Sequence, residues 1–219
     1  FEKNAKEDTR LIKAKTSDNP YLPEGFIDSL LENYPPQLIQ AYLNGNFTNL
    51  TTGAVYSRFD RNKHVIDKLP FPVENEIIKI GIDFNVMNCN AVVCVTAADK
   101  LIIIDEITKQ QDTDALAKEI VRRYGNNKIL VYPDASGANR STINASKTDI
   151  AILQSYGFTS MALRSNPPIK DRVQTLQALL ENSKGRVRLA VYAGCRRVIE
   201  CLELQSYDEK TGDPDKQNG

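Results

Sequence analysis

Apolar positions divide the chain into a first third with short, interrupted patterns and a longer region with strong periodicity. In the first part, apolar residues at helical spacing predict two short helices, Gly25–Tyr34 and Pro36–Leu43, between turn-forming residues. Ala54–Phe59 then has the composition of a short strand. We therefore expect a helical or extended N-terminal segment, followed from Ile77 by a regularly folded domain.

From Ile77 onward, apolar runs predict strands and apolar residues at helical spacing predict helices. The expected strands are Ile77–Phe84, Ala91–Ala97, Leu101–Ile107, Ile129–Pro133, Thr159–Leu163 and Arg186–Tyr192. The expected helices are Thr113–Tyr124, Thr148–Tyr156, Pro168–Asn182 and Cys195–Gln205. Three successive strands, followed by strands that alternate with helices, are typical of a mixed sheet with helices on its faces. The predicted fold class is α/β.

Composition and charge exclude several classes of protein. The 219 residues are 41% hydrophobic and 26% charged, which is typical of a globular domain. Lys plus Arg and Asp plus Glu both number 28, so any basic surface for nucleic acid must be local. No apolar run approaches the roughly 20 residues that cross a bilayer. The sequence contains neither the P-loop of many NTPases nor the GxSxG motif of serine hydrolases.

The four cysteines show no pattern typical of a metal or redox site. Cys89 and Cys94 lie in strand-like sequence, and Cys195 and Cys201 lie in a predicted helix. None forms a CxxC pair, and the single histidine is His64. This pattern indicates buried thiols in a reducing compartment rather than disulfides or zinc ligands.

Two aspartates stand where predicted strands end. Asp83 lies near the end of Ile77–Phe84, and Asp134 directly follows Ile129–Pro133. Ligands of open α/β sheets bind at the carboxyl ends of strands, so these carboxylates lie close together if their strands are neighbours. Two like charges repel unless a cation neutralises them, and carboxylates without His or Cys partners suit Mg²⁺ or Mn²⁺. Alternatively, Asp83 caps a turn and Asp134 begins an Asx-turn.

A second acidic pair, Asp105 and Glu106, lies at the end of Leu101–Ile107. Adjacent residues of a strand point to opposite faces of a sheet, so at most one of them can join Asp83. A solvated strand end is one interpretation of this pair. The other interpretation makes Glu106 an additional metal ligand or a partner of one.

The segment KGRVRLAVYAGCRR is basic and contains no acid. Its charged residues are Lys184, Arg186, Arg188, Arg196 and Arg197. Clustered positive charge near an aromatic residue can follow a nucleic-acid backbone. Arg186 and Arg188 fall on the same side of a predicted strand, which favours a DNA-binding stripe over a solvated face.

A series of short motifs runs from Asp18 to the last residue, and their order along the chain is part of the signal. The series comprises DNPYLP, YLNGNF, GAVYSRFD, GIDFN, IIIDEIT, VYPDASG, NPPIKDRVQTLQALL and CRRVIECLELQSYDEKTGDPDKQNG. Together they resemble the C-terminal nuclease domain of the large terminase subunit of tailed bacteriophages, the DNA-packaging motor. The resemblance implies a ribonuclease H-like mixed sheet flanked by helices. It also implies that residues 1–53 are a linker from a preceding ATPase domain, and that residues 54–219 are a nuclease domain with an incomplete C-terminal end.

The resemblance implies a metal-dependent endonuclease that cuts concatemeric double-stranded DNA during genome packaging. Asp83 and Asp134 match the two catalytic, metal-binding aspartates of the family, which holds two Mg²⁺ or Mn²⁺ ions when DNA is bound. A third acidic ligand is expected in an Asp-His motif beyond Gly219, and Asp213 and Asp215 are further candidates in the loop before it. The implied partners are DNA, the portal protein, the small terminase subunit and the ATPase domain. The implied location is the cytoplasm of the infected bacterium.

Three alternatives stay open. A non-catalytic docking module of the motor would bind DNA without cutting it. A ribonuclease H-like resolvase or transposase would keep the fold and cut another substrate, although the motifs before Ile77 resemble terminases alone. An actin-like or sugar-kinase ATPase also begins its sheet with an aspartate, but the sequence DFNVMNC lacks the glycine and hydroxyl that admit phosphates.

Overall fold

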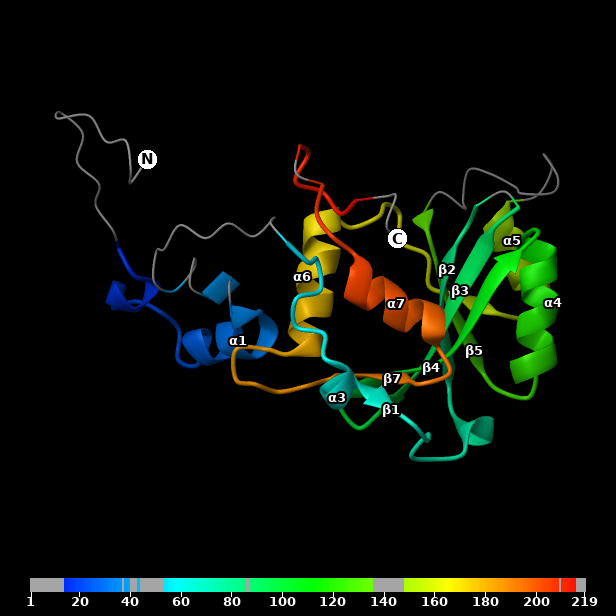
Figure 1. The fold of residues 1–219 in the computed structure, drawn as a ribbon, viewed down its shortest axis with the longest axis horizontal. Helices are drawn as coiled ribbons and strands as arrows, with labels where there is room; N and C mark the ends of the chain where they lie inside the picture. The colour runs from blue at the N-terminus through cyan, green and yellow to red at the C-terminus, as the bar shows by residue number, and fades with distance from the viewer. Residues whose placement is uncertain are drawn as a thin grey trace.

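The computed structural model of the chain describes residues 14–36, 38, 39, 43, 53–85, 87–135, 148–208 and 210–215. Its centre is a mixed sheet of seven strands with helices on both faces (Figure 1). The α/β prediction is therefore confirmed.

The sheet has the strand order β1-β7-β4-β3-β2-β5-β6. The strands are β1 (Val65–Ile66), β2 (Ile78–Asp83), β3 (Cys89–Ala97), β4 (Lys100–Gln110), β5 (Ile129–Pro133), β6 (Thr159–Ser160) and β7 (Leu189–Tyr192). The central strands β2, β3 and β4 form an antiparallel meander. On one side β7 is parallel to β4 and β1 is parallel to β7, and on the other side β5 is parallel to β2 and β6 is parallel to β5.

Helices surround this sheet, and some of them pack on its two faces. They are α1 (Phe26–Asn33), α3 (Arg61–His64), α4 (Thr113–Tyr124), α5 (Asp149–Ser155), α6 (Ile169–Leu180) and α7 (Arg196–Leu204), with two 3₁₀ helices, η1 (Thr16–Asp18) and η2 (Val73–Asn75). Helices α4 and α5 lie against one face, and α6 and α7 lie on the other (Figure 1). In the described part of the chain, no helix combines the length and the apolar character needed to cross a membrane.

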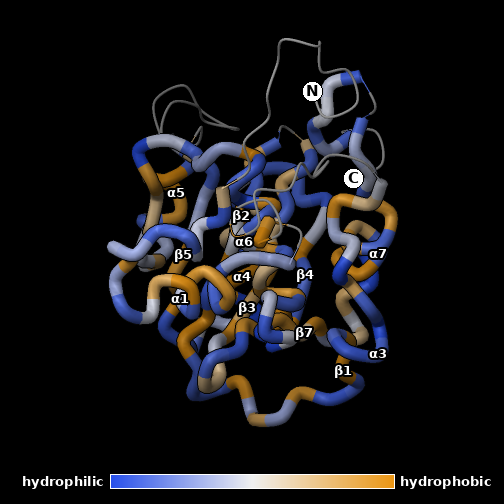
Figure 2. Tube along the Cα trace, turned by 90° about the vertical axis from the view of Figure 1, so that its left-hand side faces the viewer, coloured by the Kyte–Doolittle hydropathy of each residue, from blue (hydrophilic) through white to orange (hydrophobic). Residues whose placement is uncertain are grey.

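The alternation of residues along β2 determines which face each side chain occupies. Ile78, Ile80 and Ile82 are buried in the cluster that includes Leu116 and Ile120 of α4. Burial of each isoleucine contributes about 1.5–3 kcal/mol. The residues between them point to the opposite face. Figure 2 shows hydrophobic and hydrophilic residues interspersed along the trace of the chain. Asp83 therefore points to the face on which α6 and α7 lie.

A second apolar cluster lies on that opposite face. It joins α7 to β4 and β7 through Ile103, Leu189, Val191, Ile199 and Leu202. All four thiols are free, with Cys89 and Cys195 buried, as predicted, and Cys94 and Cys201 only half-buried. Burial raises the pKa of Cys94 and of Cys195 to about 12.

The strongest sequence patterns predict element bounds well. Helix α4 and strand β5 have the predicted bounds. The Asp112 carboxylate accepts a hydrogen bond from the Ala115 N–H at 2.8 Å and so defines the start of α4. Helix α1 confirms the prediction over Gly25–Tyr34, and half of the predicted helix Pro36–Leu43 lies outside the described residues.

The predicted strand Ala54–Phe59 is wrong. Ala54 forms only an isolated bridge with Ser206, and the chain then turns, with the Phe59 N–H bonded to the Tyr56 carbonyl at 2.9 Å. Val55 is fully buried, as a strand residue would be, and its N–H donates to the Gln205 carbonyl at 2.8 Å. The apolar composition of this segment therefore reflects its packing beside the end of α7. The described residues there form no strand with which the segment could pair.

Two predicted strands are longer than the observed ones. Strand β6 ends at Ser160, and β7 begins only at Leu189. The Arg186 carbonyl accepts the Asn182 N–H at 3.1 Å and the Arg188 N–H donates to the Leu179 carbonyl at 2.8 Å, both near the end of α6. The Arg188 carbonyl accepts the Leu101 N–H of β4 at 2.9 Å, but the regular strand begins one residue later. The prediction that these two arginines share one side of a strand is therefore wrong.

Candidate functional site

Asp83 and Asp134 lie side by side at the carboxyl ends of β2 and β5. The two strands are parallel neighbours, and Ile82 is in register with Pro133. The Asp134 N–H continues the pairing by donating to the Ile82 carbonyl at 3.1 Å. Neighbouring strands are about 4.8 Å apart, so the two aspartates lie next to each other at the ends of these strands. This meets the condition under which the sequence predicts a common site.

An asparagine amide contacts each of these carboxylates. Asn85 donates from Nδ2 to Oδ2 of Asp83 at 2.7 Å. Asn166, in the loop between β6 and α6, donates from Nδ2 to Oδ2 of Asp134 at 2.7 Å. Asn166 also accepts the Ala135 N–H on Oδ1 at 3.0 Å. Both carboxylates therefore have an uncharged donor beside them.

Sequence reasoning missed both asparagines. Asn85 stands two residues after Asp83 in GIDFN, where its position beside the strand end was a usable signal. Asn166 is separated from Asp134 by 32 residues. Its contact depends on the path of the loop before α6, which hydrophobic periodicity does not specify.

The sheet face beside Asp83 is open within the described residues. Asp83 itself is exposed. A Cβ atom at Gly81, two residues earlier on the same face, would meet no heavy atom within 4 Å. Tyr132 is in register with Gly81 on β5 and is 42% exposed. A large ligand can therefore approach the two carboxylates from this side.

The donor set of the site suits a hard divalent cation. Carboxylate oxygens are preferred ligands of Mg²⁺ and Mn²⁺, and each oxygen has two lone pairs, so one amide donor does not exhaust a carboxylate. Across the described ranges, no three His, Cys, Asp or Glu side chains converge to form a metal site. Asp83 and Asp134 thus fit two ligand positions of an oxygen-coordinated centre, which needs further ligands.

Comparison with known proteins identifies the family. The model of a family described as the terminase RNaseH-like domain matches residues 80–219. The chain belongs to this family. No protein of curated function matches it.

Solved structures show the fold of this terminase domain. A large terminase from a thermophilic bacteriophage, in complex with ATP-gamma-S, is 18% identical with a TM-score of 0.72, and the match covers 93% of this chain and 51% of that chain. Another crystal form of the same bacteriophage protein gives 19% identity and a TM-score of 0.71, with 93% and 50% coverage. The chain therefore spans about half the length of that large terminase. The expected ribonuclease H-like mixed sheet flanked by helices is confirmed.

The large terminase nuclease of the thermophilic phage G20c, solved with bound magnesium, also matches this chain. It is 17% identical with a TM-score of 0.45, and the match covers 73% of this chain and 84% of that chain.

In this terminase domain, Glu106 caps a helix. Its two carboxylate oxygens accept the N–H groups of Arg197 at 3.0 Å and Val198 at 2.8 Å, in the first turn of α7. These N–H groups have no partner inside the helix, and the positive end of the helix dipole favours a carboxylate there. Glu106 is on the same face as Asp83, but β3 separates their strands.

Asp105 points to the opposite face, as alternation predicts. Its carboxylate forms an ion pair with Arg123 at 2.7 Å and accepts the Tyr124 hydroxyl at 2.8 Å. Burial and this hydrogen bond raise the pKa of Tyr124. Asp105 therefore connects β4 to α4 and does not join Asp83.

Asp213 and Asp215 lie in a turn that folds back beside the end of α7. The Asp213 carbonyl accepts the Asp208 N–H at 2.8 Å, and the Asp215 N–H donates to the Ser206 carbonyl at 2.9 Å. Gln205 also donates to the Asp215 carbonyl at 2.6 Å. The structure fixes the backbone of both residues, but it does not bring three acids of the described chain together at Asp83.

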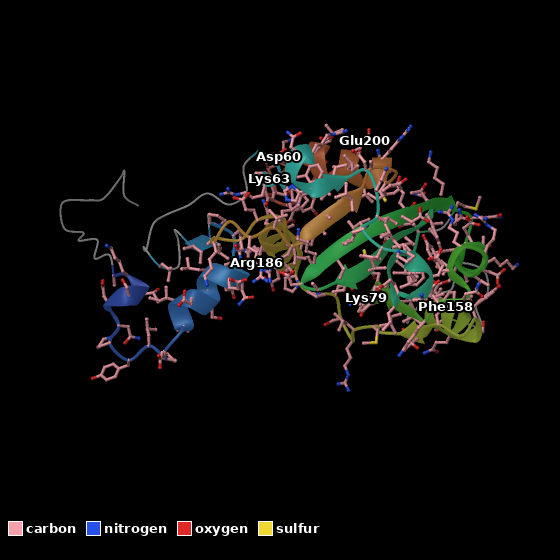
Figure 3. The ribbon with its side chains drawn as sticks, turned by 90° about the horizontal axis from the view of Figure 1, so that it is seen from below. Asp60, Lys63, Lys79, Phe158, Arg186 and Glu200 are labelled. Atoms are coloured by element: carbon pink, nitrogen blue, oxygen red, sulfur yellow. The ribbon has the colours of Figure 1, made fainter. Side chains whose placement is uncertain are left out.

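Part of the basic segment forms ion pairs near α1. Lys184 lies 3.4 Å from Asp28 and 3.6 Å from Glu32. Arg186 pairs with Glu32 at 2.8 Å and with Asp99. Figure 3 shows Arg186 between α1 and the sheet. Arg188 donates to the Glu32 carbonyl at 3.2 Å. Acids of the same chain thus already neutralise much of this charge.

The Asp99 turn is far from Asp83. Strand β3 runs antiparallel to β2 from Asn90, the partner of Asp83, to the turn that contains Asp99. At about 3.3 Å per residue, this path is roughly 30 Å long. Arg186 therefore lies near the opposite ends of the strands from the two carboxylates.

Arg196 and Arg197 belong to the first turn of α7 and are both exposed. Arg197 pairs with Glu200 at 2.7 Å, and none of the ion pairs of the described chain includes Arg196. Since Glu106 caps this same turn, the two arginines stand closer to the centre of the sheet than the α1 contacts.

Proposed function

We propose that this chain is the nuclease domain of a large terminase subunit and acts as a divalent-metal-dependent endodeoxyribonuclease. The substrate would be concatemeric double-stranded viral DNA, cut by two-metal hydrolysis of phosphodiester bonds during genome packaging. The observation that carries the proposal is the adjacency of Asp83 and Asp134 at the carboxyl ends of β2 and β5, in a member of the terminase RNaseH-like domain family.

Asp83 and Asp134 would hold the metal. Two Mg²⁺ or Mn²⁺ ions, when bound, would supply the Lewis acidity that activates a water and stabilises the leaving 3′-oxygen. Asp83, at the more exposed position, would be the principal ligand of these ions. Two carboxylates neutralise half of the four positive charges, so a third acid and the DNA phosphate would complete the balance. Asp213 and Asp215 are the candidates for the third acid in this chain, because the carboxylate of Glu106 is engaged by α7.

The wider role follows from the family. Residues 1–53 would connect this nuclease domain, residues 54–219, to the ATPase domain of the packaging motor. The portal protein and the small terminase subunit would be partners, and the cytoplasm of the infected bacterium would be the place of action. Arg196 and Arg197 are the proposed main contacts with DNA phosphates. Lys184, Arg186 and Arg188 are further candidates, of which Lys184 and Arg186 are already paired with acids of the chain.

A non-catalytic DNA-binding or docking module is the second candidate. It is favoured by the lack of a three-acid cluster among the described residues. A resolvase or transposase nuclease would share the carboxylates, but the family match favours a terminase.

The test is cleavage of a supercoiled plasmid by this chain in Mn²⁺, Mg²⁺ or EDTA, with Asp83→Asn beside it. Asp67→Asn is a matched control, since Asp67 is an exposed aspartate next to the edge strand β1. We expect cleavage that needs metal, is lost in Asp83→Asn and persists in Asp67→Asn. DNA binding without cleavage in every metal would support the docking module instead.

A further inference from the structure

The side chain of Asn166 forms a two-point clamp on the end of β5. Its Nδ2 donates to the Asp134 carboxylate at 2.7 Å, and its Oδ1 accepts the N–H of the next residue, Ala135, at 3.0 Å. One bond holds the side chain of Asp134 and the other holds the backbone that follows it. Together they fix the orientation of this carboxylate relative to the strand.

The loop that carries Asn166 is anchored at both ends. At its start, the Met161 N–H donates to the Val131 carbonyl of β5 at 2.8 Å. At its end, Pro167 and Pro168 restrict the backbone, and the Pro168 carbonyl accepts the Asp171 N–H at 3.0 Å at the beginning of α6. The amide is therefore held in place before any ligand arrives.

The chemistry of the clamp suits a metal ligand. An arginine or lysine in this position would neutralise the carboxylate and compete with a cation. An amide orients the carboxylate by a hydrogen bond and leaves its negative charge intact. Asn85 contacts Asp83 in the same way at 2.7 Å, and none of the ion pairs in the described chain involves Asp83. Each carboxylate thus accepts a hydrogen bond from an asparagine amide.

We propose that Asn166 is a positioning residue of the nuclease site, which holds Asp134 in the orientation that binds metal, and that Asn85 supports Asp83 in the same way. This inference rests on the proposed metal-dependent function. It assigns neither asparagine a bond to the metal or to DNA.

The experiment measures the affinity for Mn²⁺ by calorimetry in the wild-type chain, Asn166→Ala, Asp83→Asn and a control, Asn127→Ala. Asn127 is matched because its amide also makes two hydrogen bonds, to the carbonyls of Val73 at 2.7 Å and Glu76 at 3.0 Å. It precedes β5, at the end opposite to Asp134. Asn166 is exposed, so its truncation removes no buried apolar contact and should leave the fold intact; the unfolding temperature without metal checks this.

We expect Mn²⁺ to bind about tenfold more weakly to Asn166→Ala, a loss typical of residues that orient metal ligands, while Asn127→Ala binds as the wild type does. Cleavage by Asn166→Ala should recover when the Mn²⁺ concentration is raised, which a general loss of structure would not allow. Equal Mn²⁺ affinity in Asn166→Ala and wild type would overturn the inference and leave the proposed function standing. Wild-type protein that binds Mn²⁺ no better than Asp83→Asn would overturn both.

Discussion

The N–H of Asp134 donates to the carbonyl of Ile82 at 3.1 Å, which ties the residue after β5 to the residue before Asp83. This bond extends the β2–β5 register by one step beyond the regular strands. The two carboxylates are consequently held together at the ends of neighbouring strands, although two strands and a helix separate them along the chain. Two carboxylates on neighbouring strand ends favour the binding of a cation that neutralises them.

Asp134→Asn should not destabilise the protein in the absence of metal. The substitution keeps the shape of the side chain and removes repulsion with Asp83, so the unfolding temperature in EDTA should stay constant or rise. The stabilisation that Mn²⁺ gives to the wild type should disappear, because a ligand stabilises only the state that binds it. Thermal unfolding with and without Mn²⁺ measures both effects. A large loss of stability in EDTA would indicate a structural role for this carboxylate.

Glu106→Ala should lower stability without removing the metal site. The variant leaves two N–H groups at the start of α7 without their acceptor, and loss of a helix cap costs about 0.5–2 kcal/mol. Urea unfolding measures the free energy of unfolding, and plasmid cleavage at low temperature measures activity. Retained cleavage at reduced stability is the expected result. Lost cleavage at unchanged stability would make Glu106 a metal ligand.

The sequence predicts the central architecture because its signals there are local. Helix α4 has an Asp112 cap, a regular apolar face and Gly125 after its last residue, and each of these acts within one or two turns. Strand β5 is a continuous apolar run ended by Asp134. Such elements are predictable because neighbouring residues determine them.

The remaining features depend on contacts that are distant in the sequence. Ala54–Phe59 has the composition of a strand, yet its pairing within the described residues is limited to an isolated bridge between Ala54 and Ser206 and the bond from the Val55 N–H to the Gln205 carbonyl. The clamp by Asn166 depends on a loop path between two elements. The sequence predicts that Arg186 is available to bind DNA, but in the fold it forms ion pairs with Glu32 and Asp99.

DNA binding should depend more on Arg196 and Arg197 than on Arg186. Removal of a phosphate contact lowers the slope of log K against log salt by about 0.9. Arg196→Ala with Arg197→Ala should therefore weaken binding of a short duplex and flatten its salt dependence. Arg186→Ala should change the slope little, since this arginine is paired with acids near the strand ends opposite to Asp83. Binding titrations with catalytically inactive Asp83→Asn protein over a range of salt measure both slopes.

An equal loss of slope in Arg186→Ala would show that DNA displaces its acidic partners. The stripe predicted from the sequence would then include Arg186 despite its position outside β7.

Glu119 should contribute to stability only above acidic pH. Hydrogen bonds from Arg122 and Arg123 lower its pKa from 4.5 to about 2. A carboxyl group with a lowered folded-state pKa stabilises the protein above its unfolded pKa, and this contribution is lost as pH falls through the folded value. The difference in unfolding temperature between wild type and Glu119→Gln should thus be constant at neutral pH and shrink between about pH 4.5 and pH 2. A difference independent of pH would contradict the ion pairs.

The most direct test of the central claim is a double-mutant cycle of Mn²⁺ affinity with Asp83→Asn, Asp134→Asn and the variant that combines them. If the two carboxylates form one metal site, each single substitution should weaken binding at least a hundredfold, and the double variant should bind no more weakly than either single variant. This non-additivity is the mark of residues that act as a unit. Single variants that retain wild-type affinity, or losses that simply add, would contradict the claim that Asp83 and Asp134 bind the same metal.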